Sequence, residues 1–337
     1  MKLLKALKSI FGRGEQTAPL RQMSKNDQQA VRQQPTHSAD AETHFKKAVE
    51  AMENAQFDVA STYFEKAARL GHTAAQYSLA CNYHFGNGVP KDEVKAVEWY
   101  TRAADAGHAL SQYELAMCYD KGTGVMQNPH KALYWLTKAA EQEHSKAQLE
   151  TALRYYHGSG TTQNLAKAVE WFEKAAVQGE DEAQLAMGLC YSSGEGVAQD
   201  PAKAVYWYTL AAKQGLPEAQ HNLGVCYFQG AGIAQDHKKA VYWWNEAANG
   251  EYLVSYYNLG YCYEKGFGVH QNYTQAINYY VYAAKRGHAK SQFNLGALYL
   301  NGMGVSKNEE TGLMWMKKAA QQGHPRAIEI LKDFGAE

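Results

Sequence analysis

Histidines and cysteines recur at regular spacing in this chain, and they are the side chains best suited to chemistry. Multiples of 36 residues separate His72, His108, His144, His288 and His324, and likewise Cys118, Cys190, Cys226 and Cys262. Neutral imidazole and thiolate sulfur bind zinc, and an activated thiolate is a nucleophile. Both roles need partners within reach, so the elements that carry these residues decide whether such a site exists.

The spacing belongs to a 36-residue unit that returns seven times between Thr73 and His324 without insertion or deletion. Each unit has Tyr at its eleventh position and, three residues later, a Gly-x-Gly sequence, from Tyr83 with Gly86 and Gly88 to Tyr299 with Gly302 and Gly304. A fixed period of this length is typical of a solenoid, in which each unit buries its apolar face against its neighbours.

Each unit reads as two helices. In the first unit Ala75, Leu79, Ala80 and Tyr83 follow the 3.6-residue spacing of one buried stripe, and Gly tolerates the left-handed backbone that ends a helix. The second helix is expected to begin after an Asp or Asn cap at the twentieth position: Asp92, Asn128, Asn164, Asp200, Asp236, Asn272 and Asn308. The pattern predicts an all-α fold.

This architecture separates the recurring side chains. Successive units lie about one helix spacing apart, roughly 10 Å, which is too far for a disulfide or for shared ligation of one metal ion. Cys81 lies at the ninth position without a partner in its own unit. The Gly-x-Gly sequences follow helices instead of strands, so they do not predict a nucleotide site. We therefore expect no catalytic residues, no cofactor, no metal and a reducing compartment.

The motif Ala-x-x-x-Leu-Gly-x-x-Tyr-x-x-Gly-x-Gly-Val, followed by Asp, Lys-Ala, Trp-Tyr and Ala-Ala, resembles the Sel1-like repeat of the tetratricopeptide-like superfamily. The unit from Pro217 to Tyr227, continued by Lys239-Ala240 and Trp243, is among the closest matches. The resemblance covers about three quarters of the chain and implies a right-handed α/α superhelical solenoid whose members mostly act as adaptors for other proteins. Thr151, Thr161 and Gly312 depart from the motif.

The remaining segments give the expected domain organisation. Residues 1–12 form a basic amphipathic helix, 13–40 a flexible polar linker, 41–72 a degenerate N-terminal capping repeat, and 325–337 a C-terminal capping helix. The seven full repeats are 73–108, 109–144, 145–180, 181–216, 217–252, 253–288 and 289–324.

Residues 1–11 could contact a membrane. Leu3, Leu4, Leu7, Ile10 and Phe11 fall on one helical face, opposite Lys2, Lys5 and Lys8. Such a helix suits anionic lipid or a groove in a partner, although so short a segment is also marginal as an isolated helix. Lysines interrupt the apolar residues, so we expect no signal peptide, no transmembrane helix and a cytoplasmic protein that can lie peripherally at a membrane.

Charge argues against nucleic acid as a partner. The chain has 34 basic and 34 acidic residues. Residues 1–40 have seven basic and three acidic residues, a net charge of +4, so residues 41–337 have 27 basic and 31 acidic residues, a net charge of −4. Nucleic acid would require a clustered basic surface.

The function is therefore expected on the first-helix face, defined here as positions 2, 5, 6, 9, 12 and 13 of each repeat, opposite the buried stripe. In a solenoid of this kind it lines the concave groove. The sequence predicts a non-enzymatic adaptor or scaffold, in signalling or regulatory complexes, that binds a peptide or amphipathic helix of a partner protein there. The candidate partner-binding residues are Tyr77, His84, Tyr113, Asp120, Tyr156, His221, Phe228, Tyr257, Tyr261, Glu264 and Phe293.

Three alternatives remain open. Rings at the fifth position could pack on the neighbouring repeat instead of binding a partner. The resemblance also allows an envelope or secreted protein with penicillin-binding or β-lactamase activity, although the chain has no Ser-x-x-Lys sequence for the serine chemistry. A third alternative is a bacterial effector or virulence factor that binds host proteins.

Overall fold

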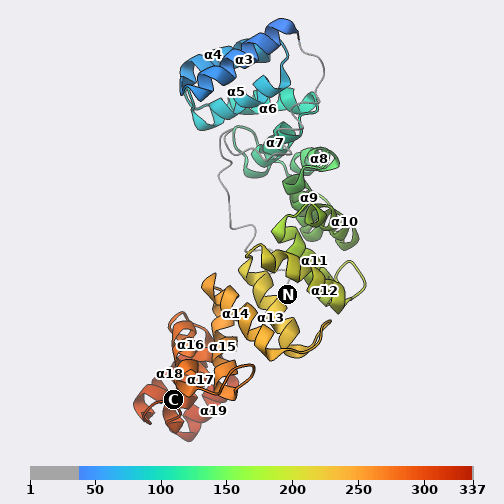
Figure 1. Ribbon diagram of the computed structural model, residues 1–337. Helices are drawn as coiled ribbons and strands as arrows, with labels where there is room; N and C mark the ends of the chain where they lie inside the picture. The colour runs from blue at the N-terminus through green and yellow to red at the C-terminus, as the bar shows by residue number, and fades with distance from the viewer. Residues whose placement is uncertain (1–37, 336–337) are drawn as a thin grey trace. The chain divides into compact units, whose positions relative to one another are not determined.

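The computed structural model describes residues 38–335, which form 17 helices and contain no strand (Figure 1). The first helices of the seven repeats are α5 (Thr73–Phe85), α7 (Ala109–Lys121), α9 (Ser145–His157), α11 (Asp181–Ser193), α13 (Pro217–Gln229), α15 (Leu253–Lys265) and α17 (Ala289–Asn301). The second helices are α6 (Glu93–Asp105), α8 (Pro129–Glu141), α10 (Leu165–Val177), α12 (Pro201–Lys213), α14 (His237–Asn249), α16 (Tyr273–Lys285) and α18 (Glu309–Gln321). The prediction of an all-α solenoid of helix-turn-helix repeats is confirmed.

Three more helices flank the repeats. They are α3 (Ala39–Glu53), α4 (Phe57–Arg69) and α19 (Pro325–Asp333). The backbone N–H of Ala41 donates to the Ser38 hydroxyl at the start of α3, so this helix begins inside the segment expected to be linker. The predicted amphipathic helix at residues 1–11 lies outside the described residues. None of the helices from α3 to α19 has the length and apolar character needed to cross a bilayer.

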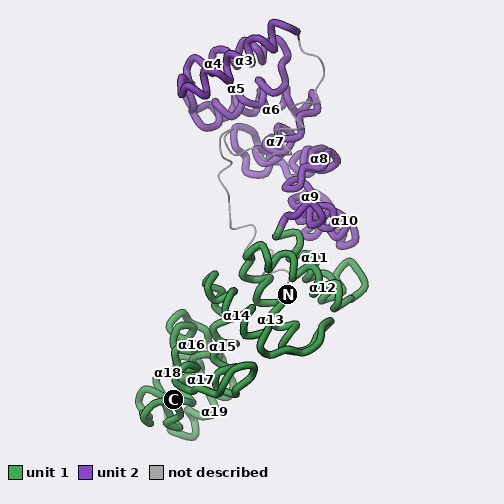
Figure 2. The backbone as a smooth tube through the Cα atoms, viewed as in Figure 1, with its two compact units in different colours: residues 1–6, 181–337 green, residues 7–180 purple. Residues whose placement is uncertain are grey.

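The described chain divides into two compact units, residues 38–180 and residues 181–335 (Figure 2). Within each unit, every helix packs against the next one along the chain. The cores combine small residues, such as the buried Ala103 and Ala104, with fully buried rings, such as Tyr100 in residues 38–180 and Tyr280 in residues 181–335. The small residues let helices approach closely, and the rings fill the space between them.

The loop inside each repeat is held by backbone geometry and a side-chain cap. In the first repeat Gly86 ends α5 with a left-handed φ of 77°, and the backbone N–H of Asp92 donates to the carbonyl of Tyr83 at 2.9 Å. The Asp92 carboxylate then accepts from the backbone N–H of Lys95 at 3.0 Å and so caps α6. Side chains at the same position cap all seven second helices, which confirms the predicted start of each.

The second glycine of the loop has a further role that the sequence did not reveal. A Cβ at Gly124 would lie 2.1 Å from the carbonyl oxygen of Glu93, in the preceding repeat, and one at Gly232 would lie 2.2 Å from that of Pro201. No real Cβ fits at that distance. The loop therefore touches the start of the preceding second helix, and glycine permits this approach of two backbones as well as the left-handed turn.

Two glutamates occupy left-handed backbone positions at which the other repeats have glycine. Glu143 has a φ of 63° and Glu251 a φ of 61°, whereas Gly107, at the equivalent place, has a φ of 88°. A Cβ at Gly107 would meet no atom within 4 Å, so a side chain fits there and only the backbone conformation is strained.

We predict that Glu143→Gly stabilises the protein. Glycine adopts this φ without the strain that an L-residue bears, so the free energy of unfolding should rise by about 0.5–1 kcal/mol. Urea unfolding followed by circular dichroism measures it. Glu141→Gly, two residues earlier and at the last residue of α8, is the control and should lower stability by up to about 1 kcal/mol. Equal losses in both variants would contradict the strain argument.

Candidate functional site

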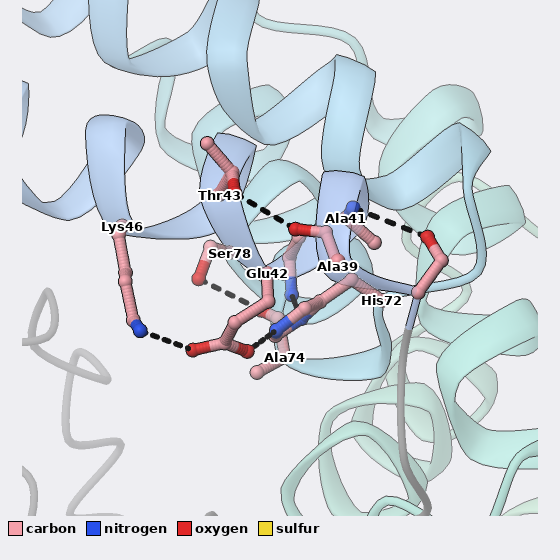
Figure 3. A network of polar contacts seen from close by, with 10 residues as sticks. Ala39, Ala41, Glu42, Thr43, Lys46, His72, Ala74 and Ser78 are labelled. Carbon is pink, nitrogen blue, oxygen red and sulfur yellow. Dashed lines mark hydrogen bonds and ion pairs between the residues drawn. The ribbon is translucent and has the colours of Figure 1, made fainter.

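The recurring histidines begin the first helices of the repeats. The backbone N–H of Ser111 donates to Nδ1 of His108 at 3.2 Å, and His72, His144 and His288 accept in the same way. Figure 3 shows the first of these caps, where Glu42 lies between Nε2 of His72 at 3.2 Å and Nζ of Lys46 at 3.6 Å. A histidine whose Nδ1 accepts from the backbone is neutral, and its role here is to cap the start of a helix.

Histidines at these helix starts also contact the aromatic residues at the fifth position. The ring of Tyr113 stacks on His144 with centroids 4.9 Å apart, and Phe293 stacks on His324 at 4.4 Å. Tyr77 and Tyr257 contact His108 and His288 in tilted arrangements. Each ring packs against the histidine that begins the next first helix. The structure therefore favours packing on the neighbouring repeat for the four predicted binding residues Tyr77, Tyr113, Tyr257 and Phe293.

One repeat carries the same pair with its two members exchanged. The fifth position of repeat 217–252 is His221, and the residue that begins the next first helix is Tyr252. Their ring centroids lie 5.0 Å apart, and Nδ1 of His221 lies 2.9 Å from the hydroxyl of Ser255. The exchange preserves the ring contact, which supports its role in joining repeats.

The recurring histidines and the cysteines are poorly suited to catalysis. Burial lowers the pKa of His108 to about 4 and also lowers those of His288 and His324. All five cysteines are free, and burial raises the pKa of Cys118 to about 12 and that of Cys226 to about 11, so the unreactive thiol dominates at neutral pH. Within residues 38–335 no three His, Cys, Asp or Glu side chains are grouped to hold a metal.

Three predicted polar residues already have partners. Nδ1 of His84 lies 2.6 Å from the carboxylate of Glu93, and Asp120 pairs with the buried guanidinium of Arg154 at 2.6 Å. Glu264 accepts from the Tyr280 hydroxyl at 2.8 Å. These contacts join neighbouring helices.

Two predicted residues are enclosed by protein. Tyr156 is 6% exposed and His221 is 8% exposed, so neither offers a surface to a partner. We leave both out of the candidate site.

The remaining predicted residues, Phe228 and Tyr261, lie together in an aromatic cluster. Their ring centroids are 6.5 Å apart, and Phe267 packs on Phe228 at 5.6 Å and on Tyr261 at 5.8 Å. His237 contacts Phe228 and Phe267. All four residues are half-buried, so part of each stays open to solvent. Sequence reasoning did not include Phe267 and His237 because they lie in the loop and at the start of α14.

Two carboxylates on the same face were also absent from the predicted set. Glu114 and Glu150 occupy the sixth position of adjacent repeats, where the sequence signal is an acidic residue in place of Ser78, Ala186 or Asn222. Both are half-buried. Desolvation raises the pKa of Glu114 to about 7 and is the main cause of the raised pKa of Glu150. Carboxyl groups of this kind are disfavoured in their charged form.

A glutamine pair that joins the two ends of a repeat is a further feature not predicted. The side-chain amide of Gln142 donates to the side-chain oxygen of Gln112 at 2.7 Å, and Gln112 in turn donates to the carbonyl of Ala104. The pair returns as Gln148 with Gln178, Gln184 with Gln214, and Gln292 with Gln322. Because these side-chain amides hydrogen-bond within the repeats, we assign them to the packing of the repeats and not to a binding site.

Comparison with known proteins shows where this geometry occurs. The Sel1 repeat family matches residues 60–72, 73–108, 109–144, 145–180, 181–216, 217–252, 253–288 and 289–324. A protective antigen present in uropathogenic Escherichia coli strains, which displays an SLR fold, is 30% identical with a TM-score of 0.80, and the similarity covers 90% of this chain and 65% of the antigen. A Sel1 repeat protein from Oxalobacter formigenes is 29% identical with a TM-score of 0.66, over 98% of this chain and 93% of that protein. No curated protein matches.

Proposed function

Because the chain belongs to the Sel1 repeat family, we propose that it is a non-enzymatic adaptor that binds a peptide or amphipathic helix of a partner protein on its first-helix face. The fold is generally used for protein–protein interaction. The partner would bind in the cytoplasm, in a signalling or regulatory complex, and residues 1–11 would add contact with a membrane surface.

The observation that supports this proposal is the cluster of Phe228, Tyr261 and Phe267. The four Tyr and Phe rings at the fifth position pack against histidines at helix starts, whereas Tyr261 touches only Phe228 and Phe267 among the described rings. Half-buried aromatic side chains lose little conformational freedom on binding, and such residues dominate the energetics of protein interfaces. The cluster is therefore the proposed anchor point of a partner.

A second candidate is an effector that binds host proteins. It is supported by the similarity to the protective antigen of uropathogenic Escherichia coli, of which this chain covers 65%. The two candidates share the same surface and differ in the origin of the partner. We place penicillin-binding activity below both, and a fluorescent penicillin should leave the chain unlabelled.

Affinity capture with two matched variants tests the proposal. We predict that Tyr261→Ser reduces capture of the partner by about tenfold or more, as expected for loss of an interface aromatic. Tyr242→Ser removes a tyrosine that is 56% exposed on the second helix α14 of the same unit, and it should capture as the parent does. Quantitative mass spectrometry of the captured proteins gives the readout, from bacterial lysate and from animal-cell lysate.

The pattern of capture separates the candidates. A protein captured by the parent and by Tyr242→Ser but not by Tyr261→Ser supports binding on the proposed face. Whether it comes from the bacterial or the animal-cell lysate distinguishes the adaptor from the effector. Equal capture by the parent and Tyr261→Ser would move the binding site elsewhere. Circular dichroism of both variants confirms folding before capture.

A further inference from the structure

We propose that Glu114 and Glu150 are the receptors for two basic side chains, seven residues apart, on a helix of the partner protein. This inference rests on the proposed function, because it names the chemistry of the element that the first-helix face would bind. It concerns the unit formed by residues 38–180, and the aromatic cluster belongs to the other unit.

Glu114 lies in a setting that leaves its carboxylate without a close partner. It is on α7, and the charged groups that influence it are Lys121 and Lys146, neither of which forms an ion pair with it. The Tyr100 hydroxyl, near Glu114, donates instead to Sγ of Cys81 at 3.4 Å. No described residue donates a hydrogen bond to this carboxylate.

Glu150 repeats the arrangement one unit later, on α9. Arg154 and Lys121 are the nearby cations, and Asp120 is the nearby anion. The guanidinium of Arg154 is already bound to Asp120 at 2.6 Å, and Arg154 is only 3% exposed. Arg154 is therefore already paired with another carboxylate, and Glu150 has no ion-pair or hydrogen-bond partner among the described residues.

Two half-buried carboxylates without partners favour a cationic ligand. Desolvation weakens the ionised form of both groups, and an incoming cation restores the interaction that burial removed. The rest of the chain is also negatively charged, which suits a cationic ligand, because residues 41–337 carry a net charge of −4. A metal ion is a poor candidate for this site, because no three His, Cys, Asp or Glu side chains among the described residues lie close enough together to bind one.

The spacing of the two carboxylates selects the geometry of the partner. Equivalent positions of adjacent repeats lie about 10 Å apart, the spacing of packed helices. On an α-helix, residues i and i+7 share one face and are about 10.5 Å apart along the axis. Lysine and arginine also have long stems that reach into a partly enclosed site while packing along its walls. A helix with basic residues at i and i+7 fits the pair.

A displayed library of helical peptides tests this inference on the full chain. Positions i and i+7 are varied among all residue types, and the parent should enrich Lys or Arg at both. Glu114→Gln combined with Glu150→Gln should lower the affinity for a selected basic peptide by about thirtyfold or more. This is the effect expected when one partner of an enclosed charge pair is removed. The control is Asp105→Asn with Glu141→Gln, which removes the same charge at the same 36-residue spacing from exposed sites on α6 and α8 and should bind as the parent does.

Measuring the affinity of the basic peptide at several pH values tests the same inference, because a purely structural role of Glu114 would leave that affinity independent of its ionisation. Because the pKa of Glu114 is about 7, its ionised fraction rises about tenfold from pH 6 to pH 8. The affinity for the basic peptide should rise by about the same factor, and the Gln double variant should lose this dependence. The other charged groups that influence the two carboxylates are Lys121, Lys146, Arg154 and Asp120.

The possible failures are distinguishable. Selected peptides without basic pairs, or basic peptides that bind the Gln double variant as well as the parent, would overturn this inference and leave the proposed function intact. If the parent selects no peptide and Tyr261→Ser changes no captured protein, both the inference and the proposed function fail.

Discussion

Replacing Gly124 by alanine should strongly destabilise the packing between two repeats. The new Cβ would lie 2.1 Å from the carbonyl oxygen of Glu93 and 2.5 Å from its carbonyl carbon. Both atoms are backbone, so no side chain can rotate away and the two repeats must separate. We expect a loss of about 3 kcal/mol or more in the free energy of unfolding, since overpacking and left-handed strain add.

The matched control is Gly107→Ala. Gly107 also has a positive φ, 88°, but a Cβ there would meet no atom within 4 Å. This variant therefore reports backbone strain alone, about 1–2 kcal/mol. Urea unfolding of both variants, followed by circular dichroism, measures the difference. Equal losses would show that the contact with Glu93 does not constrain the loop.

The helices could be predicted from the sequence because their signals are local. The Asn and Asp caps, the first glycine of each loop and the apolar stripe each act within a few residues, and the structure has the expected caps on all seven second helices. The second glycine is different. Its contact runs from Gly124 to Glu93, 31 residues earlier, and only the packing of repeats brings those two backbones together.

The candidate site was harder to predict, because exposure on a helix depends on its neighbours. The face was assigned from helical geometry, which cannot show that Tyr113 stacks on a histidine that begins the next helix. Histidine is also not among the usual N-cap residues, so the caps at His72 and His108 had no local signal. Glu114 also lies on the predicted face, but its burial depends on neighbouring helices, so the sequence alone does not single it out.

The stability of residues 38–180 should respond to pH through two groups that act in opposite directions. The pKa of His108 is lowered from 6.5 to about 4, so the unfolded chain takes up a proton first and stability falls as pH drops from about 6.5 to 4. The pKa of Glu114 is raised from 4.5 to about 7, so the folded chain takes up a proton first and stability rises as pH drops from about 7 to 4.5. Each contributes up to about 3 kcal/mol.

Single variants should separate the two effects. Glu114→Gln removes a charge that is costly to bury, so the variant should be more stable than the parent by up to about 3 kcal/mol at pH 8 and should lose that advantage by pH 4.5. His108→Asn keeps an acceptor that can cap α7 but does not titrate, so its stability should rise as pH falls from 7 to 4.5. Thermal unfolding of the full chain at pH 4.5, 6 and 8 measures both.

The sign of the result for Glu114→Gln bears directly on the role of that residue. A carboxylate that served only the fold would lower stability when neutralised, because its partners would be lost. Glu114 has no ion-pair or hydrogen-bond partner among residues 38–335, so its removal at pH 8 should instead stabilise the chain while weakening the basic peptide. A residue that costs stability and supports binding is typical of a functional site. A destabilised Glu114→Gln variant at pH 8 would contradict both the burial argument and the assignment of Glu114 as a receptor.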